Sequence, residues 1–308
     1  MSDKQIESVY FVDGCVIESD YIYFASKLKS LDPNEYDFSR MFYLDRDQWI
    51  HHDLEWDVVS VCLLPETSGE RRKYCALSMQ GDVELDFPGG PEIEKIPTAG
   101  SYQGSGAVKQ IRCIDGQLYV CGDQGQVYQR KVPGEWVHID EGLLDTEISA
   151  SALDFNGMDG NGEHDLYVVG YHGRIFHRDS NGWTALDSPT NVHLERVRCV
   201  SQDKVYICGN HGTLLSGNAE GFQVHGMEDF KEHFWDLEWF EGKLYIASLV
   251  GLFEFDGEEI RPVNTGLKPE IGGYRLDSRD GVLWSFGVDD LAFYDGGQWH
   301  RMIHPDNG

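Results

Sequence analysis

Oxygen-bearing side chains crowd one stretch of the chain, LDFNGMDGNGEHDLYVVG at residues 153–170. Calcium takes six to eight oxygen ligands, and Asp and Asn residues on a glycine-kinked loop can supply them. A polar hairpin turn, in which Gly, Asn and Asp are also common, is the alternative interpretation. We interpret the stretch as an insertion between the first two strands of a repeated unit. The predicted calcium ligands, for the one cofactor that the sequence suggests, are Asp154, Asn156, Asp159, Asn161 and Asp165.

Charged side chains also fall inside segments that we expect to form the innermost strands of repeated units. Aligning the units on a shared aromatic residue places these side chains in two rows beside a central channel. Buried charges are rare unless they are paired, so pairing between neighbouring units is one interpretation. A pocket for a polar ligand is the other. One row holds Arg112, Arg198, Glu238 and Asp277, and the next holds Gln110, Arg196, Asp236 and Arg275.

Large aromatic residues lie where the chain leads into these innermost strands. Trp and Tyr dominate the hot spots of protein interfaces, and they also fill the wedge between neighbouring sheets. We predict Trp56, Trp235 and Tyr274 as partner-binding aromatics and assign Trp239 to the core.

Catalytic signatures are missing from the sequence. It contains no G-x-S-x-G elbow, P-loop, H-E-x-x-H motif or cysteine–histidine nucleophile signature. We therefore predict a protein that is not an enzyme. The rival hypothesis is a glycosidase or lyase that acts in the channel through Asp236, Glu238 or Asp277 and the nearby arginines.

A pattern of four short strands recurs along the chain. The clearest unit is IRCIDGQLYVCGDQGQVYQRKVPGEWVHID at 111–140, with relatives at 165–187, 204–226, 243–264 and 282–303 and divergent copies at 21–54 and 73–87. Successive central aromatics lie 51, 45, 48, 39, 39 and 39 residues apart. Repeats of this length with several strands each indicate a β-propeller. The central aromatics are Tyr23, Tyr74, Tyr119, Tyr167, Tyr206, Tyr245 and Trp284.

The composition of each unit favours the same architecture. Runs such as LYVVG and LYIAS are apolar and rich in β-branched and aromatic residues, which suits strands buried on both faces. The G-x-x-G connections, such as Gly122 to Gly125, can supply the positive φ of a tight hairpin. We predict an all-β fold, a seven-bladed β-propeller of four-stranded antiparallel blades.

One propeller domain is expected to span residues 1–308. The predicted blades cover residues 5–54, 55–98, 106–140, 147–188, 193–226, 234–264 and 272–303. Residues 7–12 fit either the innermost strand of the first blade or an extra strand that completes the last blade. The sequence leaves both forms of ring closure open.

The repeat Y-[IV]-x-G-x-x-G followed by G-x-W resembles the BNR-like, YVTN and WD-type β-propellers over nearly the whole chain. RDSNGWTALD at 178–187 is similar to a degenerate Asp-box, although the sialidase order Ser-x-Asp-x-Gly-x-x-Trp and the GH…WD signature of WD repeats are not kept. Residues 159–170 resemble the calcium loops of integrin-type propeller repeats, with Gly157 at the first acidic position, so Asp154 or Asn156 would substitute there. The resemblance implies an interaction platform and names no partner.

The charge balance limits the partners. The chain has 25 basic and 53 acidic residues, a net charge of −28. Such a chain repels phosphate backbones and anionic lipid, so we expect neither nucleic acid nor membrane as a partner. A basic protein is the favoured partner.

The sequence also predicts a cellular compartment and a function. The N-terminus lacks a signal peptide, no stretch approaches the ~20 apolar residues of a membrane span, and the seven cysteines form no C-x-x-C pair. We predict a cytoplasmic protein that binds a basic partner, in one version as an inhibitor or immunity protein that neutralises a toxin such as a nuclease. An assembly factor or chaperone is an alternative role.

Overall fold

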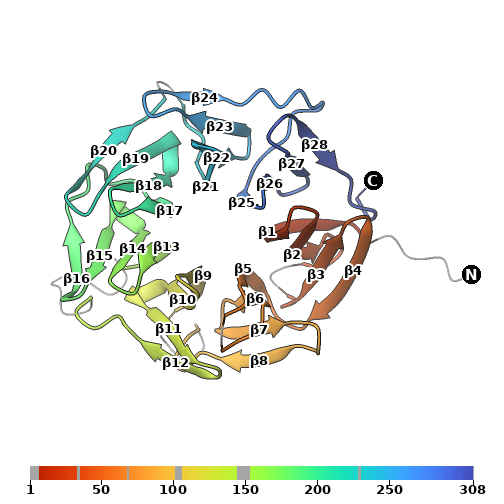
Figure 1. The fold of residues 1–308 in the computed structure, drawn as a ribbon, viewed down its shortest axis with the longest axis horizontal. Helices are drawn as coiled ribbons and strands as arrows, with labels where there is room; N and C mark the ends of the chain where they lie inside the picture. The colour runs from red at the N-terminus through yellow and green to blue at the C-terminus, as the bar shows by residue number, and fades with distance from the viewer. Residues whose placement is uncertain are drawn as a thin grey trace, which may run out of the picture.

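The computed structural model describes residues 7–32, 35–67, 69–100, 106–143, 153–227 and 230–307. In this part of the chain, 28 strands form seven four-stranded antiparallel sheets, each made of strands that follow one another in sequence. The sheets stand like blades around a central axis (Figure 1). The predicted all-β, seven-bladed propeller is therefore confirmed.

The strands of the first four blades are numbered from the axis outward. Blade one comprises β1 (Val9–Glu18), β2 (Tyr21–Leu28), β3 (Ser39–Asp45) and β4 (Gln48–Leu54). Blade two comprises β5 (Val58–Leu64), β6 (Lys73–Ser78), β7 (Asp82–Asp86) and β8 (Glu92–Lys95). Blade three comprises β9 (Val108–Ile114), β10 (Gln117–Gly122), β11 (Val127–Val132) and β12 (Glu135–His138). Blade four comprises β13 (Phe155–Gly162), β14 (Asp165–Gly170), β15 (Ile175–Asp179) and β16 (Gly182–Leu186).

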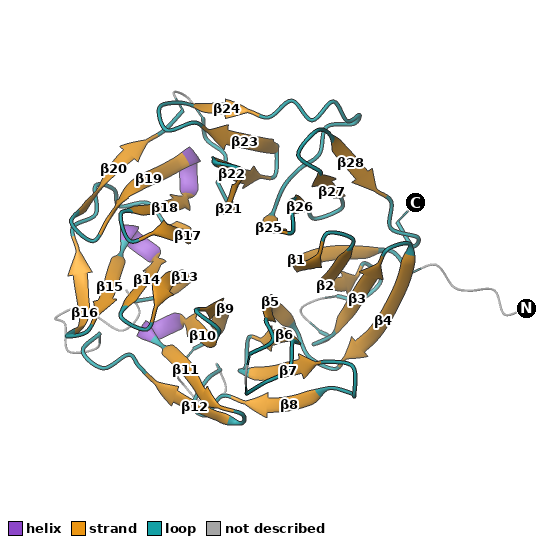
Figure 2. Ribbon diagram, viewed as in Figure 1, coloured by secondary structure: helices purple, strands orange, loops and turns teal. Residues whose placement is uncertain are grey.

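The remaining three blades repeat this order. Blade five comprises β17 (Leu194–Ser201), β18 (Lys204–Gly209), β19 (Thr213–Asn218) and β20 (Gly221–His225). Blade six comprises β21 (Asp236–Phe240), β22 (Lys243–Ser248), β23 (Gly251–Phe255) and β24 (Ile260–Pro262). Blade seven comprises β25 (Arg275–Arg279), β26 (Val282–Phe286), β27 (Leu291–Tyr294) and β28 (Trp299–Met302). Short 3₁₀ turns, η2 (Asp123–Gly125), η4 (Tyr171–Gly173) and η5 (Asn210–Gly212), follow β10, β14 and β18 (Figure 2).

Apolar clusters fill the wedges between the blades. Among the described residues there are seven such clusters, and each joins the facing sheets of two neighbouring blades. The central aromatics all lie in second strands and are buried, with Tyr23 at 0% and Trp284 at 2% exposure. Burial of this apolar surface is the main free-energy gain on folding, so each blade depends on the next.

The glycines after the second strands have two different roles. Gly125 has a φ of +80°, which lies in the left-handed region that favours glycine. Gly122 is extended instead, and a Cβ there would lie 2.4 Å from the carbonyl oxygen of Ala107. The predicted positive φ therefore holds for the second glycine of the pair, while the first permits the close approach of another backbone segment.

The ring closes without a strand from the N-terminal part of the chain in the last blade. β1 is the innermost strand of blade one, and all four strands of blade seven come from the C-terminal part of the chain. Of the two forms of closure left open by the sequence, the first is therefore correct. The amide of Phe11 donates to the carbonyl of Val288 at 2.9 Å, and the amide of Val16 donates to Asp277 at 2.7 Å.

The segment after β28 strengthens this closure. His304 is 3% exposed and packs against the rings of Phe11, Phe42 and Trp49 in the cluster between blades one and seven. The side chain of Asn307 accepts a hydrogen bond from the amide of Val9 and donates one to its carbonyl.

Within the described ranges, no helix is long and apolar enough to cross a membrane.

Acid is expected to weaken this closure through His304. Burial lowers the pKa of its imidazole to about 4, whereas an unfolded chain protonates near pH 6.5. Between these values the unfolded state binds more protons, so stability falls as the pH drops from about 6.5 to 4, by about 2–3 kcal/mol.

Urea unfolding at pH 7 and pH 4.5 measures this loss, and His304→Leu serves as the comparison. The variant keeps a buried side chain but has no proton to take up at this position. We expect it to lose less stability than the wild type on acidification. Equal losses in the two proteins would contradict the assignment.

Candidate functional site

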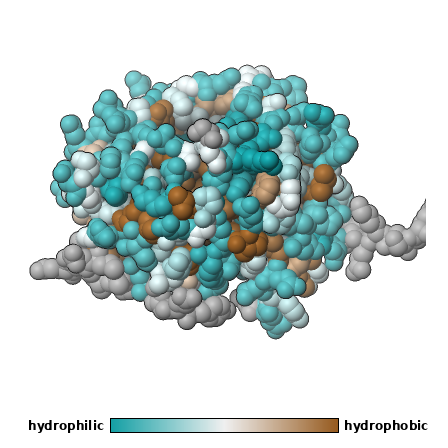
Figure 3. Space-filling model, turned by 60° about the horizontal axis from the view of Figure 1, so that its bottom comes forward, coloured by the Kyte–Doolittle hydropathy of each residue, from teal (hydrophilic) through white to brown (hydrophobic). Residues whose placement is uncertain are grey.

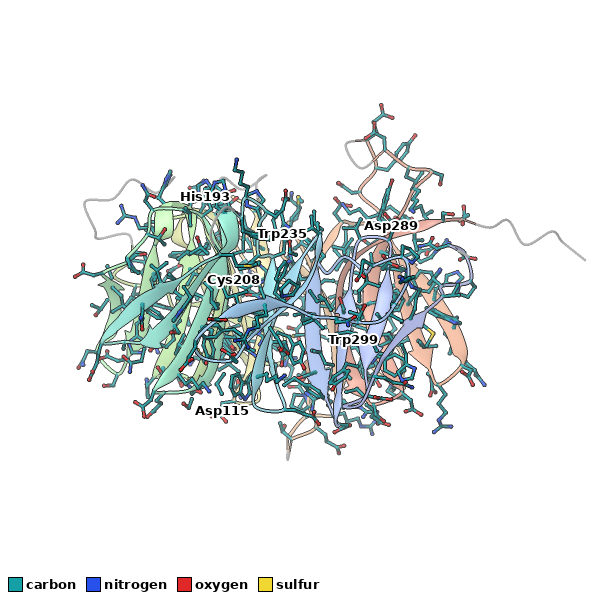
Figure 4. The ribbon with its side chains drawn as sticks, turned by 90° about the horizontal axis from the view of Figure 1, so that it is seen from above. Asp115, His193, Cys208, Trp235, Asp289 and Trp299 are labelled. Atoms are coloured by element: carbon teal, nitrogen blue, oxygen red, sulfur yellow. The ribbon has the colours of Figure 1, made fainter. Side chains whose placement is uncertain are left out.

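The propeller presents two faces and an axial channel. We define the upper face by the segments that lead into the innermost strands, which include His193 and Trp235, and the lower face by the turns between first and second strands, which include Asp115 (Figure 4). The channel runs between the faces and is bordered by β1, β5, β9, β13, β17, β21 and β25 (Figure 1).

The strand register places the predicted charged rows at the channel. Four members of the first row stand directly opposite the central aromatics of their blades. Their pairings are Arg112 with Tyr119, Arg198 with Tyr206, Glu238 with Tyr245 and Asp277 with Trp284. Asp159 belongs to the same row, because it lies opposite Tyr167.

Acidic and amide side chains of the innermost strands bind the backbone of the next blade. Asp13 accepts from the amide of Val61 at 2.8 Å, and Asp236 accepts from the amide of Leu276 at 3.0 Å. We call these contacts inter-blade hooks. Hydrogen bonds that involve a charged group are stronger than neutral ones, so the hooks add direction to the apolar packing. The remaining hooks join Gln110 to Met158, Asp159 to Cys199 and Asp277 to Val16.

Two arginines of the first row pair with carboxylates of the following blade. Arg112 lies 3.5 Å from Asp159, and Arg198 donates to Glu238. Glu238 also accepts from the hydroxyl of Ser278 at 2.8 Å. Burial raises the pKa of Glu238 above its usual value, although the positive charges of Arg198 and Arg112 oppose the shift.

The second row carries arginines with a different environment. Arg196 donates to the carbonyls of Asn156 and Glu195, and Arg275 donates to those of Trp235 and Tyr274. Burial lowers the pKa of Arg196, and the like charge of Arg275 lowers it further. Arg196 and Arg275 are 6% and 8% exposed. The second row therefore holds buried cations that contact carbonyl oxygens.

The stretch at 153–170 forms a β-hairpin whose register shifts between Phe155 and Gly157 and between Gly160 and Gly162, so its interpretation as an insertion between the first two strands is wrong. β13 and β14 are themselves those two strands, because the glycines fit within a paired strand. Asp159 is 5% exposed and faces Arg112 in the channel, while Asp165 binds His177 at 2.8 Å.

The other predicted calcium ligands also have protein partners. Asp154 accepts from the amide of Gln124, Asn156 donates to the carbonyl of Leu194, and Asn161 donates to Asp165. In the described part of the chain, no three His, Cys, Asp or Glu side chains are grouped so as to hold a metal ion. Calcium binding stays a prediction that these contacts do not favour.

The predicted aromatics lie on the upper face but are all partly buried. Trp235 and Tyr274 contact each other, with ring centroids 5.5 Å apart, and the guanidinium of Arg275 lies 3.9 Å from the Tyr274 ring. Trp56 packs against the cluster between blades one and two. Trp239, assigned to the core, is half-buried and stacks on Tyr206. Whether the first three aromatics bind a partner stays a prediction.

The lower face carries exposed acids that the sequence analysis did not single out. Every turn between a first and a second strand presents one. Asp20 and Glu163 have basic partners, Arg46 at 3.6 Å and Lys131 at 3.1 Å. For the other five, no Lys or Arg lies within 4 Å in the described ranges. This acidic ring comprises Asp20, Glu66, Asp115, Glu163, Asp203, Glu241 and Asp280.

More acids surround the acidic ring. The turns between third and fourth strands add exposed Asp47, Glu220, Glu258 and Asp295. The surface in Figure 3 is mostly hydrophilic, with small and separate hydrophobic areas. The acids named in the lower-face turns are all exposed.

Some of these residues were accessible to sequence reasoning. The alignment on central aromatics also applies to blades four and one. There it places Asp159 in the first row and Asp13 in the second row. The acidic ring follows from the same alignment applied to the turns. Arg279, which donates to the carbonyl of Val16, lies beyond both rows and had no signal in the pattern.

Solved structures of other proteins share this fold. The WD40 β-propeller domain of Doa1 has a TM-score of 0.68 at 10% identity, with 98% of this chain and 95% of that chain covered. A structure of YCF48 bound to a D1 peptide has a TM-score of 0.67 at 12% identity, with 97% and 94% covered. Likeness at such low identity establishes the fold: this is a seven-bladed propeller of the kind that the repeat pattern resembles.

Sequence similarity gives the family. No protein-family model matches the chain. Over 250 residues it is 32% identical to the immune protein Tsi7 of Pseudomonas aeruginosa, and the match covers 81% of both chains. The chain belongs to the family of that immune protein.

Loss of one inter-blade hook is expected to destabilise the ring. Asp236→Ala leaves the buried amide of Leu276 without its acceptor, which we expect to cost about 2–3 kcal/mol. Asp236→Asn keeps the side-chain shape and one acceptor oxygen, so its loss should be smaller. Urea denaturation of each variant measures the difference.

The matched control is Asp187→Ala, which removes an exposed carboxylate from a segment of the upper face. Substitutions at such positions usually change stability by less than about 0.5 kcal/mol. An Asp236→Ala protein that unfolds at the wild-type urea concentration would show that the hook does not support the ring.

Proposed function

We propose that this chain is an immunity protein, which binds a toxin protein and blocks its action without catalysing a reaction. The single observation that carries this proposal is membership in the family of the immune protein Tsi7. The fold supports it, because a closed ring of blades offers a rigid surface and little is lost in ordering that surface on binding.

The channel gives the enzyme hypothesis little support. A glycosidase needs two carboxyl groups open to the substrate, one as general acid and the other as nucleophile or as base for a water molecule. Asp236 and Asp277 instead accept hydrogen bonds from backbone amides of neighbouring blades. Glu238 is bound to Arg198 and Ser278.

We propose the lower face as the surface that receives the toxin, and a basic protein as the toxin. The acidic ring places carboxylates around the axis there, and those of five blades have no Lys or Arg within 4 Å in the described ranges. The mouth of the channel on the upper face is lined instead by Lys27, Lys109, Arg196 and Arg275. The unpaired carboxylates of the lower face would attract a basic partner.

The same charges argue against nucleic acid as the partner, since a net charge of −28 opposes a phosphate backbone.

For the compartment, we propose the reducing cytoplasm. All seven cysteines are free, and Cys62 and Cys75 stand opposite each other in paired strands without a disulfide.

Growth protection tests the immunity function. The probe is the protein encoded by the adjacent reading frame, expressed alone and together with this chain. We expect expression alone to arrest growth and co-expression to restore it, with the two proteins co-eluting in gel filtration. Arrest that this chain does not relieve would contradict the proposal.

Association kinetics test the lower face. Asp115→Asn, Asp203→Asn and Asp280→Asn combined remove three charges, and Asn tolerates the positive φ of Asp115 and Asp280. Electrostatic steering raises association rates by about 10–10³, so we expect this triple variant to bind the same toxin about tenfold more slowly at low salt. The wild-type rate should fall as salt rises.

The control removes three charges from the upper face through Glu55→Gln, Glu232→Gln and Glu270→Gln, all exposed. Its net charge equals that of the lower-face variant, so only the position of the charges differs. We expect it to associate within about twofold of the wild-type rate, since steering depends on local potential. Equal slowing in both triple variants would refute the lower face as the docking surface.

A further inference from the structure

The channel contains a cavity that the proposed toxin binding does not use. It has a volume of about 150 Å³ and is lined by residues from six of the seven innermost strands, from Asp13 and Arg275 toward the upper face to Leu63 and Arg279 near the lower ends of their strands. At ~30 Å³ per water molecule it has room for about five waters. Five arginines from three blades reach its wall: Arg112, Arg196, Arg198, Arg275 and Arg279.

The carboxylates of the wall are already engaged. Asp13, Asp236 and Asp277 direct oxygens at backbone amides of the next blade, so these acids are turned toward the protein. Burial raises the pKa of Asp13 and of Asp277, although the positive charges of arginines in the channel oppose the shift. In the described structure none of these three acids forms an ion pair within 4 Å with Arg196 or Arg275.

Arg196 and Arg275 have hydrogen-bonding capacity left over. A guanidinium has five N–H donors in a planar fork. Each of these two arginines uses one terminal nitrogen, Nη1, on two carbonyl oxygens. The Nε of Arg275 is buried without a partner in the described structure, as is the Nε of Arg112. Leaving buried charged donors unsatisfied is costly.

A hollow on the upper face, lined in part by lysine side chains, adjoins the donors of Arg196 and Arg275. This hollow, of about 260 Å³, shares Arg196 and Arg275 with the cavity and also includes Lys27 and Lys109. Lys109 lies 2.6 Å from Asp123, and Lys27 lies 2.6 Å from Asp57. Glu195 is the one acid among the residues that line this hollow.

We propose that the axial cavity binds a small oxyanion of the phosphate or carboxylate class, held chiefly by Arg196 and Arg275. Planar guanidinium forks match both anions in two-point hydrogen bonds. The anion would separate the positive charges of Arg196 and Arg275 and fill their open donors. A cavity of about 150 Å³ has room for inorganic phosphate or a short dicarboxylate.

Thermal unfolding with added anion tests this site on the full chain. The probes are inorganic phosphate and malonate, each compared with sodium chloride at equal ionic strength. We expect at least one probe to raise Tm with saturation, whereas sodium chloride should not. The probe that saturates at the lower concentration identifies the phosphate or the carboxylate as the preferred anion.

Substitutions of Arg196 and Arg275 test whether the anion that raises Tm binds in this cavity. Arg196→Met with Arg275→Met should weaken the apparent affinity at least tenfold, while Arg196→Lys with Arg275→Lys should retain part of it because the charges remain. Arg261→Met, at an exposed position in blade six, should bind as the wild type does. If the methionine variant does not fold, the lysine variant still tests the site, because loss of the planar forks should weaken binding severalfold.

Three results would overturn the proposal. The first is a Tm shift equal to that of sodium chloride. The second is a saturable shift that survives in both arginine variants. The third is saturation by a short acidic peptide at a far lower concentration than by either small anion. The last result would assign the arginines to a protein carboxylate. None of these measurements requires the toxin, so they are independent of the proposed immunity function.

Discussion

The structure depends on the closure of a ring in which no blade is stable alone. Each blade buries one apolar cluster against the blade before it and another against the blade after it. Apolar packing gives no direction by itself. The inter-blade hooks supply direction, because a carboxylate such as Asp236 or Asp277 must point at one particular amide of the next innermost strand.

This arrangement decides where function can lie. Hooks and ion pairs engage the acids of the channel, whereas the acids in the lower-face turns are exposed. The acidic ring therefore belongs to the lower face, where exposed carboxylates such as Asp203 and Glu241 cost the fold little. Arg196 and Arg275, which keep unused donors, belong to the channel, where they line its cavity. Opposite charges are thus separated between a surface suited to a basic protein and an interior suited to a small anion.

Much of the fold could be predicted from sequence, because a propeller repeats one local pattern. The spacing of aromatics from Tyr119 to Trp284 defined the units, and antiparallel pairing then placed Arg112, Glu238 and their neighbours in one row. Charged residues inside apolar strands could be assigned to the channel for the same reason.

Other features depend on contacts between distant segments. Ring closure rests on Phe11 meeting Val288, and the local pattern of residues 7–12 fits either form of closure. Asp159 was assigned to a calcium loop because composition alone does not reveal which side of a strand a carboxylate faces. Its register opposite Tyr167 turns it toward Arg112 instead.

Hydrogen exchange on the complex with the toxin tests the central claim most directly. Protection should appear in the lower-face turns around Asp115, Asp203 and Asp280, and the upper-face segments that contain Trp235 and Tyr274 should exchange as in the free protein. Protection confined to those upper-face segments would contradict the account, since it would place the toxin against the aromatic and basic side of the ring.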